Sequence, residues 1–270
     1  MLSLQRHVPA PLDRFIENLW YWEGDPRAYA REAITASNAP GLLISLRCDE
    51  LSWYTGERYT QKNFLKGMVL CGTHAGHFAI DAHQPHMMGV QFRPGGFYPF
   101  IGPAAHEFHN THVSLEDVWG RDAERLHQRL LQAPTPSDKF DILQAELIRL
   151  APRAFERHPA VELALRRFAR GAVNVAATAR EAEISQKKFI RLFSEQVGLT
   201  PKLYLRVARF QRVMECITHA AAIDWWDVVE QHGYYDQPHF IRDFRDFTGF
   251  TPTQWLKLRG PFLHHIPLPD

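Results

Sequence analysis

Two stretches of this chain carry the same exposed side-chain types at a separation of 51 residues, and these side chains are the first candidates for chemistry. In each stretch a glutamine is followed four and five positions later by an isoleucine and an arginine. Repetition of a core residue would indicate only that the two stretches fold in the same way. A repeated hydrogen-bonding and charged set indicates that both copies contact the same kind of partner. The two sets are Gln186, Ile190 and Arg191, and Gln237, Ile241 and Arg242.

A short helix is expected to position each set. In the second copy Asp236 is a good N-cap, because its carboxylate can accept the free N–H groups of the first turn, and Gly249 can end the helix. Phe240, Phe244 and Phe247 follow at spacings of four and three, so they share one helical face and leave the polar set on the other. The first copy repeats this pattern through Ser185, Phe189, Phe193, Gly198, Thr200 and Pro201.

Each of these helices is preceded by another helix. Asn174 can cap a helix over 175–182 before the first copy, and Asp224 can cap the matching helix before the second. A helix over 160–170 comes before the first unit, and a long helix from 201 to about 218 joins the two units. A helix, a short turn and a polar-fronted helix together predict a helix-turn-helix.

The first part of the chain has the pattern of short strands separated by turns. Residues 11–22 indicate a short amphipathic helix or a helix that runs into a strand. Gly56 lies in a predicted hairpin turn, and residues 93–96 end the last strand. Many short strands with Gly and Pro between them favour a β-sandwich or barrel, a fold that commonly encloses a small cavity. The expected strands cover 41–46, 51–54, 59–64, 68–70, 77–80 and 87–92.

From Ser114 the pattern changes to helix. Ser114 and Asp117 are similar to a capping box, and the helical stripe that follows is interrupted near Gly120. A later helix carries apolar residues at spacings of three, four and three, over too few turns for a coiled coil. We prefer to interpret it as packing against the β domain, with a dimer interface as the alternative. Its apolar residues are Phe140, Leu143, Leu147 and Leu150.

Histidines and tryptophans of the first part are candidate ligand-binding residues. Metal sites use histidines, but a pair at a spacing of three, such as His74 and His77, would point to opposite faces of a strand. We therefore interpret these histidines as core or surface residues and expect no metal and no cofactor. Trp20, Trp22 and Trp53 could line an apolar pocket, although core packing is the preferred interpretation of each.

Composition and charge are those of a globular protein with a mild basic bias in its second part. Hydrophobic residues make up 45% of the chain and charged residues 23%. Residues 160–270 hold 15 Lys/Arg against 12 Asp/Glu, a net charge of +3, whereas the remainder of the chain has a net charge of −2. The positive sign of the second part is the one that nucleic-acid binding requires. The sequence shows no membrane span or signal pattern, so we expect a cytoplasmic protein without membrane contact. Cys48, Cys71 and Cys216 share no metal spacing and indicate reduced thiols.

The segment from Gly233 to Pro252 resembles the C-terminal signature of the AraC/XylS family of bacterial transcription regulators, whose DNA-binding domain is two helix-turn-helix units joined by a long helix. Residues 89–97 look like part of the N-terminal domain of one subgroup. Such domains are usually cupin-like β-barrels that sense an effector, dimerise, or both. The resemblance implies an α+β two-domain protein, with a β-barrel or sandwich and a helical extension over 1–152 and an all-α domain over 158–260, whose units cover about 160–200 and 219–258 around a linker helix of about 201–218.

This resemblance also implies that one recognition helix of each unit reads a major groove of DNA. An arginine can form a bidentate bond with guanine, a glutamine with adenine, and an isoleucine can pack on a thymine methyl group, while lysines and helix N-termini hold phosphates. The chain departs from the family pattern at Val229, His232 and Pro238, and Pro238 removes one polar contact from the second helix. Lys187 and Lys188 give the first helix two cations where the second has Pro238 and His239, so we expect the first helix to contribute more of the affinity. The implied reading residues are Gln186, Lys187, Lys188, Ile190 and Arg191, then Gln237, Pro238, His239, Ile241 and Arg242.

The main hypothesis is a sequence-specific DNA-binding transcription regulator that is not an enzyme. Its expected partners are double-stranded DNA, a small-molecule effector, a second copy in a homodimer, and RNA polymerase, on the nucleoid of a bacterial cytoplasm. The rival is a cupin-type metal enzyme or a DNA-repair methyltransferase fused to the same DNA-binding module. That rival needs converging histidine and carboxylate ligands or a zinc-activated cysteine cluster, which Cys48 and Cys71 alone cannot form.

Overall fold

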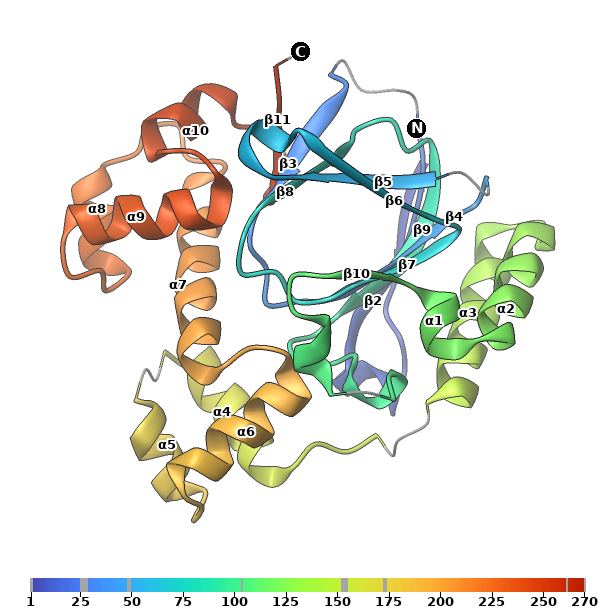
Figure 1. Cartoon of the computed structure of the whole chain (residues 1–270), viewed down its shortest axis with the longest axis horizontal. Helices are drawn as coiled ribbons and strands as arrows, with labels where there is room; N and C mark the ends of the chain where they lie inside the picture. Colours follow the sequence, from blue (N-terminus) through green and yellow to red (C-terminus); the bar gives the residue numbers. More distant parts are fainter. Residues whose placement is uncertain are drawn as a thin grey trace.

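A computed structural model describes residues 2–24, 29–47, 50–102, 104–151, 155–171, 174–260 and 262–269. A β-rich part is followed by a helical part, so the expected α+β architecture is confirmed (Figure 1). The expected domain boundary at Pro152, as well as Cys48, lies outside the described residues.

Two antiparallel sheets form the β-rich part, and in the described residues they do not close into one barrel. The six-stranded sheet has the order β1 (Leu2–Arg6), β2 (Ile16–Glu23), β9 (His86–Phe92), β4 (Gly41–Ser45), β7 (Met68–Cys71) and β10 (His112–Ser114). The five-stranded sheet has the order β11 (His265–Pro267), β3 (Arg31–Ile34), β8 (Phe78–Asp81), β5 (Glu50–Thr55) and β6 (Gln61–Lys66). Short 3₁₀ turns accompany them at η1 (Leu12–Arg14), η2 (Glu57–Tyr59), η3 (Tyr98–Phe100) and η4 (Ala105–Phe108).

Period-two alternation gives the six-stranded sheet two different faces. Leu19 and Tyr21 of β2 lie in a core that includes the helices α1 (Leu115–Trp119), α2 (Arg121–Gln132) and α3 (Pro136–Leu150), which cover one side of the β part (Figure 1). Trp20 and Trp22 point to the other face, toward the second sheet. The apolar stripe of α3 therefore packs against the β domain, with Phe140, Leu143 and Leu147 buried and Leu150 half-buried.

The five-stranded sheet is likewise covered on its outer face, here by the helical part. Ala33 of β3, Tyr54 of β5 and Ala79 of β8 belong to one core with Phe247 and Trp255 of the last helices. Buried apolar surface is thus shared between the β-rich part and the second helix-turn-helix unit, so the two parts are packed together rather than merely tethered.

The helical part contains the two predicted units with their predicted caps. Side chains of Asn174, Ser185, Asp224 and Asp236 each accept a hydrogen bond from a backbone N–H in the first turn of the helix that follows. Gly198 and Gly249 end the second helix of each unit with φ values of 93° and 81°, a left-handed conformation that favours glycine. The helices are α4 (Pro159–Ala169), α5 (Val175–Glu181), α6 (Gln186–Val197), α7 (Pro201–Ile217), α8 (Trp225–Gln231), α9 (Gln237–Thr248) and α10 (Pro252–Leu258).

Several local expectations require correction. Residues 11–22 form the short turn η1 followed by the strand β2. The prediction of one amphipathic helix is therefore wrong. The alternative, a helix that runs into a strand, is correct for the strand, but only a 3₁₀ turn precedes it. Ser114 caps α1 through the N–H of Glu116 rather than through the expected pairing with Asp117. The C-terminal part is not entirely helical, because residues 265–267 return as β11 and pair with β3. None of the helices in the described ranges has both the length and the apolar character of a membrane span.

Candidate functional site

The outer face of α6 carries the first predicted reading set in an accessible position. Gln186, Lys187, Lys188 and Arg191 are exposed, and Ile190 is half-buried. The Arg191 side chain is 65% exposed and lies 3.2 Å from Glu195, four residues along the helix. Such an exposed pair contributes little to stability, so the guanidinium can exchange this partner for another at small cost.

The outer face of α9 presents the second set less uniformly. Pro238, Ile241 and Arg242 are exposed and Gln237 is half-buried. His239, however, has its Nε2 atom 3.4 Å from Arg209 and 3.8 Å from the buried carboxylate of Asp243. The imidazole is therefore partly held by the protein's own charges. A partner would have to compete with them.

Two large side chains beside α9 are far more exposed than their types would predict. Tyr235, next to the N-cap, is 91% exposed, and Trp226 in the first turn of α8 is 70% exposed. Large aromatic side chains usually bury most of their surface. Sequence reasoning did not single them out as candidates, although Tyr235 belongs to the three-residue turn that makes the second unit one residue longer than the first.

A buried charge cluster fixes α9 against the linker helix α7. Asp243 is only 2% exposed, and its two oxygens accept hydrogen bonds from Arg206 at 2.6 Å and Arg209 at 3.0 Å. Arg209 also donates to the carbonyl oxygen of Gly233 at 3.2 Å and lies over the Tyr234 ring. The equivalent position in the first copy is Leu192, so this cluster belongs to the second unit alone.

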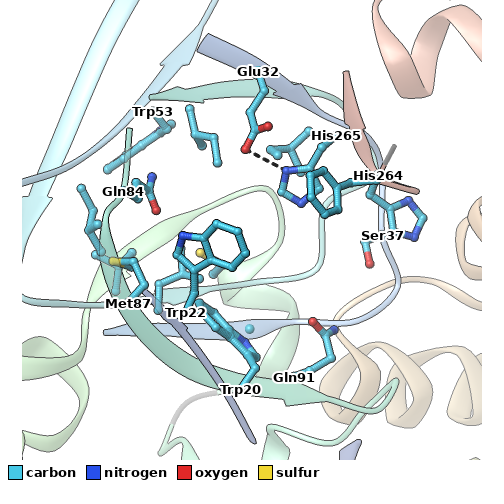
Figure 2. Close-up of a pocket in the computed structure, with 18 of the residues that line it drawn as sticks. Trp20, Trp22, Glu32, Ser37, Trp53, Gln84, Met87, Gln91, His264 and His265 are labelled. Carbon is cyan, nitrogen blue, oxygen red and sulfur yellow. Dashed lines mark hydrogen bonds and ion pairs between the residues drawn. The ribbon is translucent and has the colours of Figure 1, made fainter. Parts of the chain in front are cut away.

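A second candidate site is a cavity of about 700 Å³ between the two sheets. Trp20, Trp22 and Trp53 line it and are half-buried, as the pocket alternative predicts (Figure 2). Trp20 and Trp22 also pack against the buried cluster of Leu51, Val69 and Met87, so the interpretation as core residues holds for these two as well. Gly89 makes room for this arrangement: a Cβ atom there would lie 2.6 Å from the Trp20 ring and 2.2 Å from the carbonyl oxygen of Leu42. A cavity of this size suits a small organic molecule.

Aromatic and imidazole rings form one wall of this cavity. His112 stacks on Trp53 with ring centroids 4.5 Å apart, and His74 lies 4.7 Å from His112 and 4.6 Å from Phe78. Burial lowers the pKa of His74 to about 3 and that of His112 to about 4, so both rings are neutral near pH 7. Within the described residues, no three histidine, cysteine or carboxylate side chains converge in a way that could hold a metal ion.

The end of the chain closes another side of the cavity. His265 of β11 contacts Glu32 at 2.9 Å (Figure 2). The neighbouring His264 contacts Thr35 at 3.1 Å. Gln211 of the linker helix α7 lines the same space. The cavity is therefore formed by both parts of the chain, which no local sequence pattern indicated.

Residues 72–77, between β7 and β8, contact both helix-turn-helix units. A Cβ atom added at Gly198, which ends α6, would lie 2.8 Å from the Thr73 hydroxyl, and one added at Gly249, which ends α9, would lie 2.8 Å from the His77 ring. Ala75 packs against the cores of both units. This loop also carries His74 of the cavity wall, so it connects the cavity directly to α6 and α9.

Comparisons with known proteins are consistent with this division of the chain. Residues 178–258 match the family model of a helix-turn-helix domain, and residues 5–114 match that of a domain of unknown function, DUF6597. No curated protein sequence matches the chain. Among solved structures, the C-terminal domain of the response regulator AraT from Geobacillus stearothermophilus is 19% identical, with 38% of this chain and 87% of that one covered and a TM-score of 0.35. ToxT from Vibrio cholerae is 9% identical, with 89% and 97% covered and a TM-score of 0.45.

Proposed function

Since the chain carries an AraC-type helix-turn-helix domain and is an AraC/XylS-family transcription regulator, we propose that it reads a specific DNA sequence through α6 and α9 and that a small molecule in the cavity controls this reading. The observation that carries the proposal is the duplicated, capped helix whose outer face carries Gln, Ile and Arg side chains at equivalent positions, four of them exposed and two, Ile190 and Gln237, half-buried. Double-stranded DNA offers these side chains guanine, adenine and thymine edges in the major groove.

The proposal extends to features that the family resemblance suggests. These are domain limits of 1–152 and 158–260, a homodimer, contact with RNA polymerase and residence on the bacterial nucleoid. Tyr235 and Trp226 are added as candidates for DNA contact, because their exposure beside α9 leaves their aromatic surface available to sugar and phosphate groups. The rival metal enzyme would regain support if the purified protein held stoichiometric zinc or iron.

Direct readout predicts that Arg191→Ala and Arg242→Ala each weaken binding to a site selected from random DNA. Losing one bidentate contact with guanine corresponds to about 1–3 kcal/mol, or roughly a 5- to 150-fold rise in Kd. Fluorescence anisotropy at one fixed salt concentration measures the change. Arg121→Ala, an exposed arginine at the start of α2, serves as the matched control and should leave the Kd unaltered. Parental affinity in both test variants would refute direct readout by these arginines.

Segments that line the cavity also contact the DNA-binding part, and these contacts support control by an effector. The loop of residues 72–77, the C-terminal strand β11 and Gln211 of α7 each join a cavity wall to the DNA-binding part. A ligand that favours one placement of these segments shifts the population of DNA-binding arrangements by its differential affinity for them.

The contact between this loop and α6 can be tested with a pair of glycines. Gly198→Ala and Gly171→Ala both force alanine into a left-handed conformation, at φ values of 93° and 89°, which costs about 1–2 kcal/mol. At Gly198 the new methyl group also meets Thr73 and the carbonyl of Ala105, whereas at Gly171 it meets no described atom within 4 Å. We expect Gly198→Ala to lower the free energy of unfolding by about 1–3 kcal/mol more than Gly171→Ala, as measured by urea titration. Equal losses would show that the contact is not maintained in solution.

A further inference from the structure

Two exposed aromatic side chains lie at the N-terminal end of α9 in the second unit. Tyr235, which is 91% exposed, immediately precedes the N-cap residue Asp236. Trp226, which is 70% exposed, lies on α8 next to Trp225, whose ring centroid is 5.8 Å from that of Phe240 near the start of α9. Both side chains are therefore at the end of α9 whose residues contact base edges in helix-turn-helix proteins.

The equivalent positions of the first unit carry different side chains. Trp226 corresponds to Ala176 at the offset of 50 residues that relates α8 to α5. Tyr235 corresponds to Ile184 at the offset of 51 residues that relates α9 to α6, and Ile184 is half-buried and packs against the core of its own unit. The exposed aromatic pair is thus specific to the second unit and is not required by the duplicated fold.

Each of the two side chains carries one uncharged hydrogen-bond donor. Trp226 has an Nε1–H group and Tyr235 a hydroxyl group, and within the described part of the chain neither group is bonded to the protein. Both rings forgo the stabilisation that burial would give, which a role in folding does not explain. In a helix-turn-helix the first helix crosses the sugar–phosphate backbone of DNA, and tyrosine hydroxyls are among the groups that donate to its phosphates.

We propose that Trp226 and Tyr235 bind the sugar–phosphate backbone beside α9 through these uncharged donors, and that this contact does not weaken as the salt concentration rises. The inference rests on the proposed function for the identity of the partner. A lysine that binds a phosphate releases a condensed counterion, so its contribution decreases with salt, whereas an uncharged donor releases none. Lys187 and Lys188 of α6 therefore give the first unit a salt-sensitive contact, and the share of the affinity that comes from the second unit grows with ionic strength.

Conservative variants of the full-length protein test this contact. Trp226→Phe and Tyr235→Phe each keep a ring and remove the donor. By fluorescence anisotropy on a site selected from random DNA, each should raise the Kd about 10-fold, by the same factor at about 50 mM and about 200 mM salt. Phe64→Ala is the matched control, because Phe64 is a 54% exposed aromatic residue on β6, and it should leave the Kd unaltered at both salt concentrations.

The double variant Lys187→Ala/Lys188→Ala supplies the salt-sensitive comparison. Its effect on the Kd should shrink about 12-fold between about 50 mM and about 200 mM salt, because each lost phosphate contact lowers the slope of log Kd against log salt by about 0.9. If the effects of Trp226→Phe and Tyr235→Phe decline as steeply as that of the lysine variant, the contact is not of the uncharged kind that we propose.

A scrambled duplex of the same length separates backbone contact from the reading of sequence. Phosphates are alike in both duplexes, so each aromatic variant should lose the same factor on the selected and the scrambled DNA. If neither variant raises the Kd, or if the loss is confined to the selected site, the inference is wrong, although a parent protein that prefers its selected site would still support the proposed function. A parent protein without such a preference, whose aromatic variants nevertheless bind both duplexes more weakly, would refute the proposed function and leave the backbone contact standing.

Discussion

Replacing Asp243 with asparagine is expected to lower the free energy of unfolding by about 3–5 kcal/mol. The carboxylate is 2% exposed and holds both Arg206 and Arg209, so its loss leaves two guanidinium groups of α7 facing a neutral amide in a largely buried place. Although burial alone would lower the pKa of Arg206, the bonds to Asp243 and Asp246 outweigh it and raise that pKa, as expected of a paired cation. Urea titration followed by circular dichroism measures the change.

Asp246→Asn is the matched control for this substitution. Asp246 is on the same helix and lies 3.3 Å from the same Arg206, but its side chain is 52% exposed. Exposed pairs contribute about 0–1 kcal/mol, so the control should lose little. If the two variants lose equal stability, burial is not what makes the Asp243 cluster important. The cluster would then be an ordinary surface ion pair.

Acidification from pH 6.5 toward pH 4 is expected to destabilise the protein steeply through three histidines of the cavity. Burial lowers the pKa of His74 to about 3, and burial also lowers the pKa values of His112 and His264 to about 4. In the unfolded chain each imidazole takes up a proton below its usual pKa of about 6.5. The unfolded state therefore binds more protons across this window, so the free energy of unfolding is level above about pH 6.5 and falls as the pH decreases below it.

The size of this effect follows from the number of protons. One such imidazole contributes about 1.4 kcal/mol per pH unit, so three contribute about 4 kcal/mol per pH unit at most. Urea unfolding between pH 7.5 and pH 5 covers the range in which most carboxylates stay ionised. In the double variant His74→Phe/His112→Phe, the free energy of unfolding should change less steeply with pH, because two of the three contributing imidazoles are absent. A free energy of unfolding that is constant from pH 7.5 to pH 5 would contradict the burial of these rings.

Local sequence patterns predicted the DNA-binding part well because its determinants are local. A cap such as Asp236 and the terminating Gly249 act on the backbone of their own helix, and the spacing of Phe240 and Phe244 defines a buried face without knowledge of what covers it. The long-range ion pairs of Asp243 could not be predicted in the same way. From the sequence alone, an aspartate on a helix is predicted to be exposed to solvent. Only the position of α7 beside α9 shows that Asp243 is buried.

The cavity shows the opposite case, in which determinants lie far apart in the chain. Trp20 and Trp22 alternate with core residues along β2, and this alternation predicts that the two tryptophans share one face of the sheet. It does not predict that this face borders a cavity. The opening depends on Gly89 opposite Trp20 and on a strand that pairs residues more than 200 positions apart, such as His265 with Ile34. No window of the sequence contains both partners of that pairing, so the closing of the cavity by β11 could not be predicted.

The pairing of β11 with β3 also gives the chain an order of assembly. The ribosome synthesises the N-terminal residues first. The strand that pairs with the edge of β3, however, is formed by residues 265–267, which are made only after both helix-turn-helix units. Until then β3 presents an unpaired edge, and the cavity lacks the wall that His264 and His265 provide. Completion of the β-rich part during synthesis therefore waits for the helical part, so a nascent chain cannot acquire a finished cavity before both helix-turn-helix units have been made.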